Sequence, residues 1–145
     1  MNPDQSGTKP LGSAFNVLAG EDLTGKRSYL TALTHDTGVP EVKLPAAITA
    51  DALFLLNEEG ADAETVNVSP LVNGQEVRVK LKDTCNPGDQ LCLAATGTAA
   101  DKGKVRKVPA TTGTYRPFLI AREAGVDGQL VLAQVFHGLP SVAVA

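Results

Sequence analysis

One unit of this sequence occurs twice along the chain, and the duplication constrains the fold more than any single residue does. Gly25 and Tyr29-Leu30-Thr31-Ala32 match Gly88 and Cys92-Leu93-Ala94-Ala95. Lys43-Leu44-Pro45-Ala46 matches Lys107-Val108-Pro109-Ala110. Phe54-Leu55-Leu56 matches Phe118-Leu119-Ile120, and Gly60-Ala61-Asp62 matches Gly125-Val126-Asp127. The two copies cover roughly residues 23–70 and 86–135. Turn residues and apolar positions recur, but reactive groups do not. The duplication therefore favours a structural or binding module over an enzyme.

Short strands separated by turns dominate the middle of the chain. The clearest strand is Val77 to Lys82, where Val77, Val79 and Leu81 alternate with Arg78, Lys80 and Lys82. Asn73-Gly74 is a strong hairpin signal, because both residues tolerate a positive φ. Turn signals about every 8–12 residues are typical of a small barrel or sandwich. We therefore expect an all-β fold built from two similar internal repeats that cover each other's apolar faces.

The two ends of the chain differ from its middle. Residues 1–14 are polar and contain prolines and glycines, so we expect a flexible N-terminal arm, with Leu11 and Phe15 as apolar points that dock on a neighbour. Residues 15–136 form the single β domain in this interpretation, and residues 137–145 form an extended C-terminal tail. The N-terminal stretch does not resemble a signal peptide, and no apolar run approaches the roughly 20 residues of a membrane span. We expect synthesis in a reducing cytoplasm.

The residues that usually carry catalysis or bind metals are scarce. Cys85 and Cys92 flank a turn, and we interpret Cys92 as a small buried hydrophobe rather than half of a disulfide or metal site. His35 lies in a predicted turn and His137 at the edge of the tail, and neither has the spacing of a metal ligand or a catalytic base. We expect no catalytic residues, no metal, no cofactor and no small-molecule substrate.

Cations concentrate in the second half of the chain, although the net charge is −3. They are Arg78, Lys80, Lys82, Lys102, Lys104, Arg106 and Lys107. Aromatic residues make up only 4% of the sequence and are missing from these stretches, which disfavours a nucleic-acid surface. A solvated strand face and a contact with an acidic protein surface both stay open. For a partner contact, we select Arg78, Lys80 and Lys82, together with Leu11 and Phe15.

The order of these short motifs resembles that of the capsid cement, or head decoration, proteins of tailed bacteriophages. The motifs are Ala19-Gly20-Glu21-Asp22-Leu23, Leu53-Phe54-Leu55-Leu56, Thr65-Val66-Asn67-Val68, Val77-Arg78-Val79, Pro87-Gly88-Asp89-Gln90-Leu91, Gly103-Lys104-Val105, Phe118-Leu119-Ile120-Ala121 and Gln129-Leu130-Val131-Leu132. They extend over roughly residues 16–135. The resemblance implies a compact β domain of β-clip or tulip-like form.

The same resemblance implies a function and a location. Such proteins sit on the outside of the capsid lattice, often as trimers, and their partner is the major capsid protein. A homotrimer on the capsid exterior is therefore expected here, made in the host cytoplasm and without membrane contact. Three alternatives remain: a tail or baseplate β module of the virion, a small-barrel nucleic-acid-binding protein, and an enzyme with a duplicated barrel.

Overall fold

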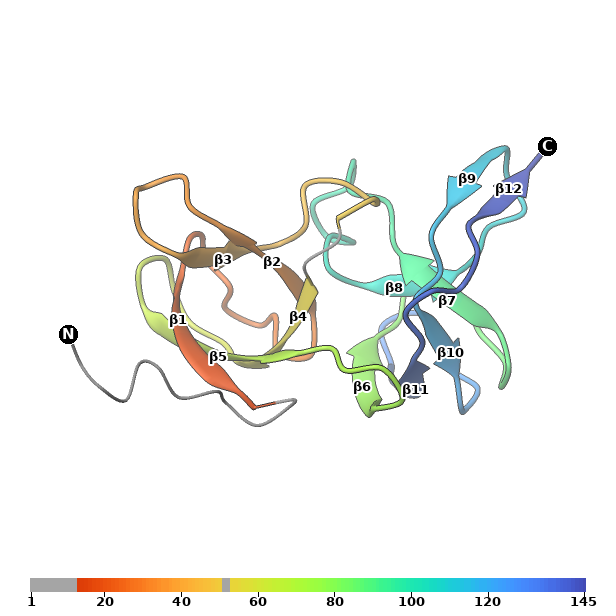
Figure 1. Cartoon of the computed structure of the whole chain (residues 1–145), viewed down its shortest axis with the longest axis horizontal. Coiled ribbons are helices and arrows are strands. Elements are labelled where there is room, and N and C mark those ends of the chain that lie inside the picture. The colour runs from red at the N-terminus through yellow and green to blue at the C-terminus, as the bar shows by residue number, and fades with distance from the viewer. Residues whose placement is uncertain (1–12, 51–52) are drawn as a thin grey trace.

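A computed structural model describes residues 13–50 and 53–145 of the chain (Figure 1). The described residues form twelve strands and no helix, so the predicted all-β class is confirmed. The strands are β1 (Phe15–Ala19), β2 (Leu30–Thr34), β3 (Glu41–Lys43), β4 (Leu53–Glu58), β5 (Thr65–Pro70), β6 (Glu76–Lys80), β7 (Gln90–Leu93), β8 (Val105–Lys107), β9 (Gly113–Tyr115), β10 (Leu119–Ala121), β11 (Leu130–Val135) and β12 (Val142–Val144). The described part of the chain contains no helix long and apolar enough to span a membrane.

The first five strands close into a barrel in the order β1-β3-β2-β4-β5. Every neighbouring pair is antiparallel except β1 with β3, which pair in parallel at Leu18–Glu41 and Ala19–Val42. Alternate side chains point inward, as the period of two along a strand requires. The buried core of this barrel consists of Val17, Ala19, Leu23, Val42, Leu56, Val66 and Val68.

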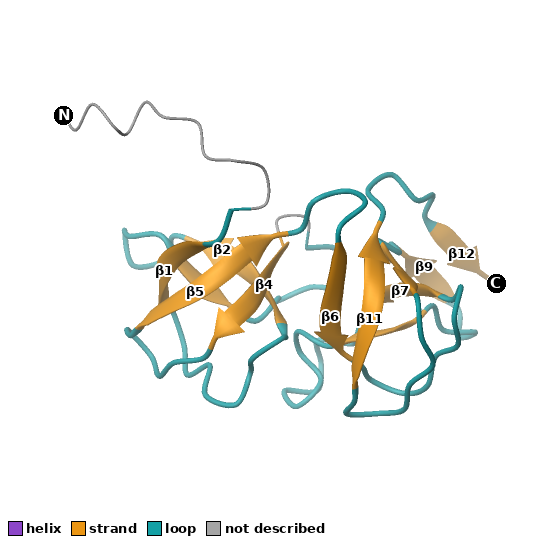
Figure 2. Ribbon diagram, turned by 90° about the horizontal axis from the view of Figure 1, so that it is seen from below, coloured by secondary structure: helices purple, strands orange, loops and turns teal. Residues whose placement is uncertain are grey.

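A second five-stranded sheet follows in the order β6-β11-β10-β7-β8. Its end strands meet through a parallel bridge between Leu81, just after β6, and Val105 in β8. This bridge nearly closes the sheet, which we call the second barrel. The alternation predicted for Val77 to Lys82 is confirmed: Val77, Val79 and Leu81 are buried in the second core. Figure 2 shows the two strand bodies side by side along the length of the molecule.

The two strand bodies repeat one pattern of pairing. Strands β1, β2, β3, β4 and β5 correspond to β6, β7, β8, β10 and β11, with the same neighbours and the same directions. The backbone hydrogen bonds at the ends of the strands match as well. The amide of Ala19 donates to the Glu64 carbonyl at 2.8 Å, and the amide of Leu81 donates to the Gln129 carbonyl at 2.8 Å. The duplication seen in the sequence is therefore a duplication of structure.

The sequence alignment is correct at one part of the repeat, the acidic hairpin turn of Gly60-Ala61-Asp62 and its match Gly125-Val126-Asp127. The Gly60 carbonyl accepts a hydrogen bond from the Leu23 amide, and the Gly125 carbonyl accepts one from the Cys85 amide. A Cβ added to Gly60 would lie 2.9 Å from Val66, and one added to Gly125 would lie 2.3 Å from Val131. In both copies the turn therefore needs glycine because a core valine packs directly against its backbone.

The other three sequence matches were wrong by one to three residues. Val42 and Val105 accept matching hydrogen bonds from Gly20 and Lys82, so Lys43 corresponds to Arg106 rather than to Lys107. The Leu56 carbonyl accepts from the Ser28 amide, and the Ala121 carbonyl accepts from the Gly88 amide, so Gly88 corresponds to Ser28 rather than to Gly25. Ser28 and Gly88 also share a positive φ, of 68° and 89°. The same bonds match Leu56 with Ala121, one residue away from the sequence alignment. A slip of one residue reverses the face to which every side chain points, so local similarity did not fix the strand register.

The two barrels are held together by the segment from Ser28 to Leu30, which we call the wedge. The Lys80 amide donates to the Ser28 carbonyl at 3.2 Å, and the Leu30 amide donates to the Gly103 carbonyl at 2.8 Å. The wedge thus bridges the end of β6 and the residues before β8, at the seam of the second barrel. The Leu30 side chain is fully buried and belongs to the second core, although β2 belongs to the first barrel.

A two-stranded ribbon completes the fold at the far end of the second barrel (Figure 1). It consists of β9 and β12, paired in antiparallel fashion at Tyr115–Val142, Thr114–Ala143 and Gly113–Val144. Tyr115 is buried, its hydroxyl lies 2.9 Å from that of Thr111, and the Arg106 guanidinium lies 5.8 Å from its ring centroid. Part of the C-terminal tail is thus paired as a strand.

Substitution of Gly103 tests the joint between the barrels. Gly103 has a φ of +81°, and an added Cβ would lie 2.7 Å from the Leu30 carbonyl oxygen. We expect Gly103→Ala to lower the free energy of unfolding by about 3–5 kcal/mol, because backbone strain and a backbone clash add. Gly74→Ala is the matched control, since its φ is +85° but an added Cβ meets nothing within 4 Å. Gly74→Ala should lower the free energy of unfolding, measured by urea denaturation, by only about 1–2 kcal/mol. Equal costs for the two variants would contradict the proposed clash.

Truncation of the wedge side chain tests whether it supports the second barrel. Leu30→Ala should lower the free energy of unfolding by about 3 kcal/mol, because a fully buried leucine leaves a cavity. Hydrogen exchange should accelerate at core amides of β6 and β11, which belong to the other barrel. Leu33→Ala in the same strand is the control: Leu33 is 44% exposed, and we expect a change of about 0.5 kcal/mol or less. Faster exchange confined to the first barrel would show that the wedge does not support the second.

Candidate functional site

The side chains that carry most catalytic chemistry lie apart from one another. His35 is exposed in the turn between β2 and β3. His137 is exposed too, and its Nε2 lies 2.9 Å from the Leu71 carbonyl oxygen. Among the described residues, no hydroxyl or thiol hydrogen-bonds to either imidazole. That part of the chain also contains no group of three or more His, Cys, Asp or Glu side chains arranged to hold a metal ion.

Both cysteines are buried as free thiols. Burial raises the pKa of the Cys85 thiol, with a smaller contribution from the charge of Asp89. Burial also raises the pKa of the Cys92 thiol, and the nearby Arg106 guanidinium acts in the opposite direction. A thiol with a raised pKa is a poor nucleophile at neutral pH. The interpretation of Cys92 as a small buried hydrophobe is confirmed, and it extends to Cys85.

The cations chosen from the sequence separate into two environments. Arg78 is exposed on β6 and its Nη1 lies 2.7 Å from Glu123 Oε1. That carboxylate also accepts a hydrogen bond from the Leu132 amide at 2.9 Å. The Leu132 amide first, and Arg78 second, hold the pKa of Glu123 below its usual range. Arg78 is therefore fixed over the sheet by a carboxylate of its own chain.

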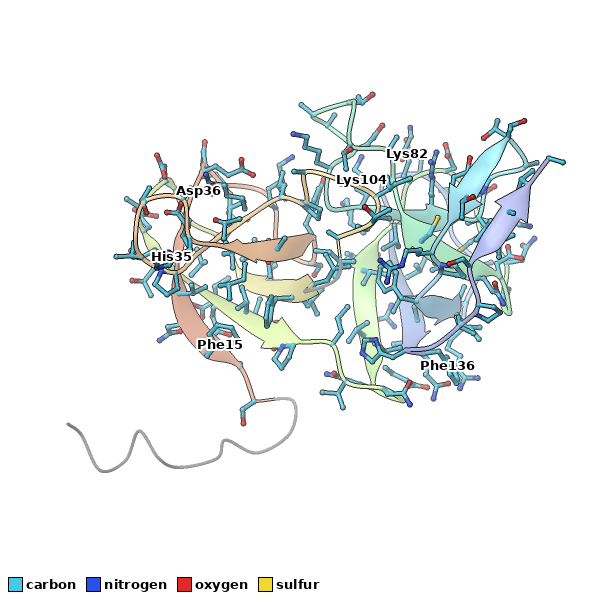
Figure 3. All side chains as sticks on the ribbon, turned by 45° about the horizontal axis from the view of Figure 1, so that its top comes forward. Phe15, His35, Asp36, Lys82, Lys104 and Phe136 are labelled. Atoms are coloured by element: carbon cyan, nitrogen blue, oxygen red, sulfur yellow. The ribbon has the colours of Figure 1, made fainter. Side chains whose placement is uncertain are left out.

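Lys82 lies beyond the end of β6, among carboxylates. Its Nζ lies 3.6 Å from Asp127, 3.8 Å from Asp83 and 4.0 Å from Asp101. Figure 3 places Lys82 near Lys104, whose Nζ lies 3.4 Å from the same Asp101. Further along, Lys107 pairs with Asp89 at 3.2 Å. These pairings neutralise much of the basic concentration locally, which weakens it as a surface for phosphates.

The outer face of the second sheet joins part of the basic strand to exposed apolar groups. We define this outer face by Arg78 and Lys80 of β6 with Leu130 and Leu132 of β11, whose side chains point away from the second core. Leu130 pairs across the strands with Lys80, and Leu132 pairs with Arg78. Leu130 is 44% exposed, so the face presents an apolar centre among charges. The cations were selected from the sequence as partner contacts, whereas Leu130 was not. Residues from Leu130 to Val135 alternate between the two faces of the sheet as those of β6 do, and this alternation could have identified Leu130.

Of the two apolar residues selected near the N-terminus, Phe15 lies within the described residues and Leu11 does not. The Phe15 ring packs edge-on against Phe54, with centroids 5.4 Å apart, and contacts the first core. It therefore contributes to the first barrel in addition to any partner contact. Leu11 lies outside the described residues.

A cavity of about 230 Å³ lies where the two barrels meet the base of the ribbon. Its walls include Ile48 and Leu53 from the first barrel, Phe118 from the second, and Leu139 just before β12. Arg116 and His137 add polar groups to the lining, and Arg116 Nη1 donates to the Thr49 carbonyl at 3.1 Å. The cavity therefore forms only when both barrels and the ribbon are in place.

The sequence matches no model of a protein family and no curated protein. The fold is similar to that of the head fiber gp8.5 N base of bacteriophage phi29, known from a crystal structure. The TM-score is 0.64 at 17% sequence identity, and the similarity covers 86% of this chain and 94% of that chain. At this identity the likeness concerns the fold: the arrangement of two small joined β bodies is one that a phage head fiber base also uses.

Proposed function

We propose that this chain is a structural protein of a bacteriophage virion, which binds the outside of the capsid and stabilises the shell across capsomer seams. The observation that carries the proposal is the shared fold with a phage head fiber base over 86% of the chain. The motif order that resembles capsid cement proteins supports it independently. Its partner would be the major capsid protein, and the protein would act as a homotrimer.

The physical properties of the body suit such a role. The wedge joins two barrels into one unit through backbone hydrogen bonds and a buried leucine. A body of this kind transmits load without bending at a flexible linker. Many identical weak contacts on a shell add through multivalency, so no single contact has to be strong.

Two surfaces are candidates for the capsid contact. The first is the arm of residues 1–14, which we propose adds as a strand to an exposed sheet edge of the capsid protein. The second is the outer face, where the exposed Leu130 lies opposite Lys80, and Leu132 lies opposite Arg78 of the Arg78–Glu123 pair. The number of copies per virion distinguishes a decoration protein from a tail or baseplate module. In purified virions the copy number of a decoration protein should approach the number of capsomers, whereas a tail or baseplate module should be present in far fewer copies.

Deletion of residues 2–14 tests the arm. We expect co-sedimentation with empty capsids to weaken by about tenfold or more, which corresponds to a loss of about 1.4 kcal/mol. The matched control replaces the same residues with a glycine–serine segment of equal length, which keeps the reach but removes Leu11. It should bind as poorly as the deletion.

This experiment distinguishes failure of the arm's role from failure of the proposed function. Undiminished binding by the truncated chain would refute the role of the arm and direct attention to the outer face. In that case Leu130→Lys should reduce capsid binding while leaving thermal unfolding nearly unchanged, because Leu130 is exposed. Absence of the full-length chain from purified virions would refute the proposed function itself.

A further inference from the structure

The ribbon carries strand edges that the fold leaves unused. Strands β9 and β12 pair with each other, and within the described residues neither pairs with a third strand. The first barrel is closed, and the seam of the second is bridged by the wedge and by the Leu81–Val105 contact. A two-stranded sheet is marginally stable alone, and its open edges invite a further strand.

The open edge of β12 is short, but it carries none of the other usual protections against pairing. Besides short length, natural edge strands are protected by charged side chains, by proline within the strand or by bulges. Residues 138–145 contain no charged residue, and the ladder from Val142 to Val144 runs without a bulge. Ala143 is small and exposed, so another backbone can approach closely.

The opposite strand of the ribbon is fastened to its own surroundings. The Tyr115 hydroxyl donates to the Thr111 carbonyl at 3.0 Å, and the Tyr115 ring is buried beside Arg106. These contacts tie β9 to the preceding turn and to β8. No side-chain hydrogen bond holds β12, whose residues are all valine and alanine. Of the two strands, β12 is therefore better placed to accept a partner.

We propose that β12 is a self-association strand, which pairs in antiparallel fashion with β12 of a second copy about a two-fold axis near Ala143. The sequence Val142-Ala143-Val144 reads the same in both directions. A two-fold axis then sets alanine against alanine and valine against valine, with no charged side chain on either side. Such a contact is self-complementary, as an isologous interface requires.

The contact joins two ribbons into one four-stranded sheet in the order β9-β12-β12-β9. Figures 1 and 2 both place β12 at the end of the molecule opposite the first barrel, where a second copy can approach. The interface is small, and small interfaces give weak, reversible association. This inference goes beyond the proposed function and stands without it, because it concerns a two-fold contact between two chains in solution and not the trimer proposed on the capsid.

Cysteine cross-linking tests the register directly. In the paired state two Ala143 residues face each other, at a separation that a disulfide can span. We expect Ala143→Cys to form a covalent dimer under mild oxidation. The matched control is Thr114→Cys, which lies opposite Ala143 in the ribbon ladder and is also exposed. Cys85 and Cys92 are buried and should not react. Equal dimer yields for both variants, or none for Ala143→Cys, would overturn the proposal.

A second pair of variants tests association without a covalent bond. Ala143→Lys places two like charges side by side at the axis, and we expect the dimer dissociation constant in sedimentation velocity to rise about tenfold. Thr114→Lys adds the same charge one strand further from the axis, so screening should leave its dissociation constant within about twofold of the original chain. A chain that sediments as a monomer at all concentrations would refute self-association. A dimer unaffected by Ala143→Lys would locate the interface elsewhere.

Discussion

The insertion of Leu30 into the second core is the contact on which the rest of the structure depends. Strand β2 serves two bodies at once: its pairing closes the first barrel, while Leu30 and the backbone around it seal the second. The cost of this arrangement is a tight backbone contact at Gly103, which only glycine accommodates. The two barrels are consequently joined into one body, and residues of both line the cavity at the ribbon base.

One matched position of the two copies carries opposite charges on the same backbone pattern. The matching hydrogen bonds of Gly20 with Val42 and of Lys82 with Val105 make Glu41 the counterpart of Lys104. Glu41 is 5% exposed, and its carboxylate lies 3.7 Å from Lys43, whereas Lys104 pairs with Asp101. The same strand position thus holds an anion in one barrel and a cation in the other, each paired locally. Such reversals conserve the fold, because what the position requires is a partnered charge rather than a particular sign.

The class of fold and its duplication were accessible from the sequence, whereas the joint between the copies was not. Alternation in Val77 to Lys82 and the glycine turns at Gly60 and Gly125 are local signals, and they predicted strands and repeated hairpins that the structure contains. The wedge depends on contacts between residues far apart in sequence, and Leu30 reads as an ordinary core leucine. The strand register was also hidden, because a one-residue slip leaves local similarity intact while reversing the buried face. Among the candidate site residues, the sequence identified the cations, but their carboxylate partners come from distant turns such as those of Glu123 and Asp127.

These pairings bear on how the molecule can recognise anything. Where cations are neutralised by carboxylates of the same chain, the long-range field that steers charged partners is weak. In the contacts that we propose, recognition would then depend on short-range features: the exposed Leu130 on the outer face and the edge of β12, which has no charged side chain. Contacts of that kind are individually weak, so they become effective when many copies are held on one surface. A rigid body that offers several small, uncharged contacts is suited to a lattice in which each copy contributes little and the sum is large.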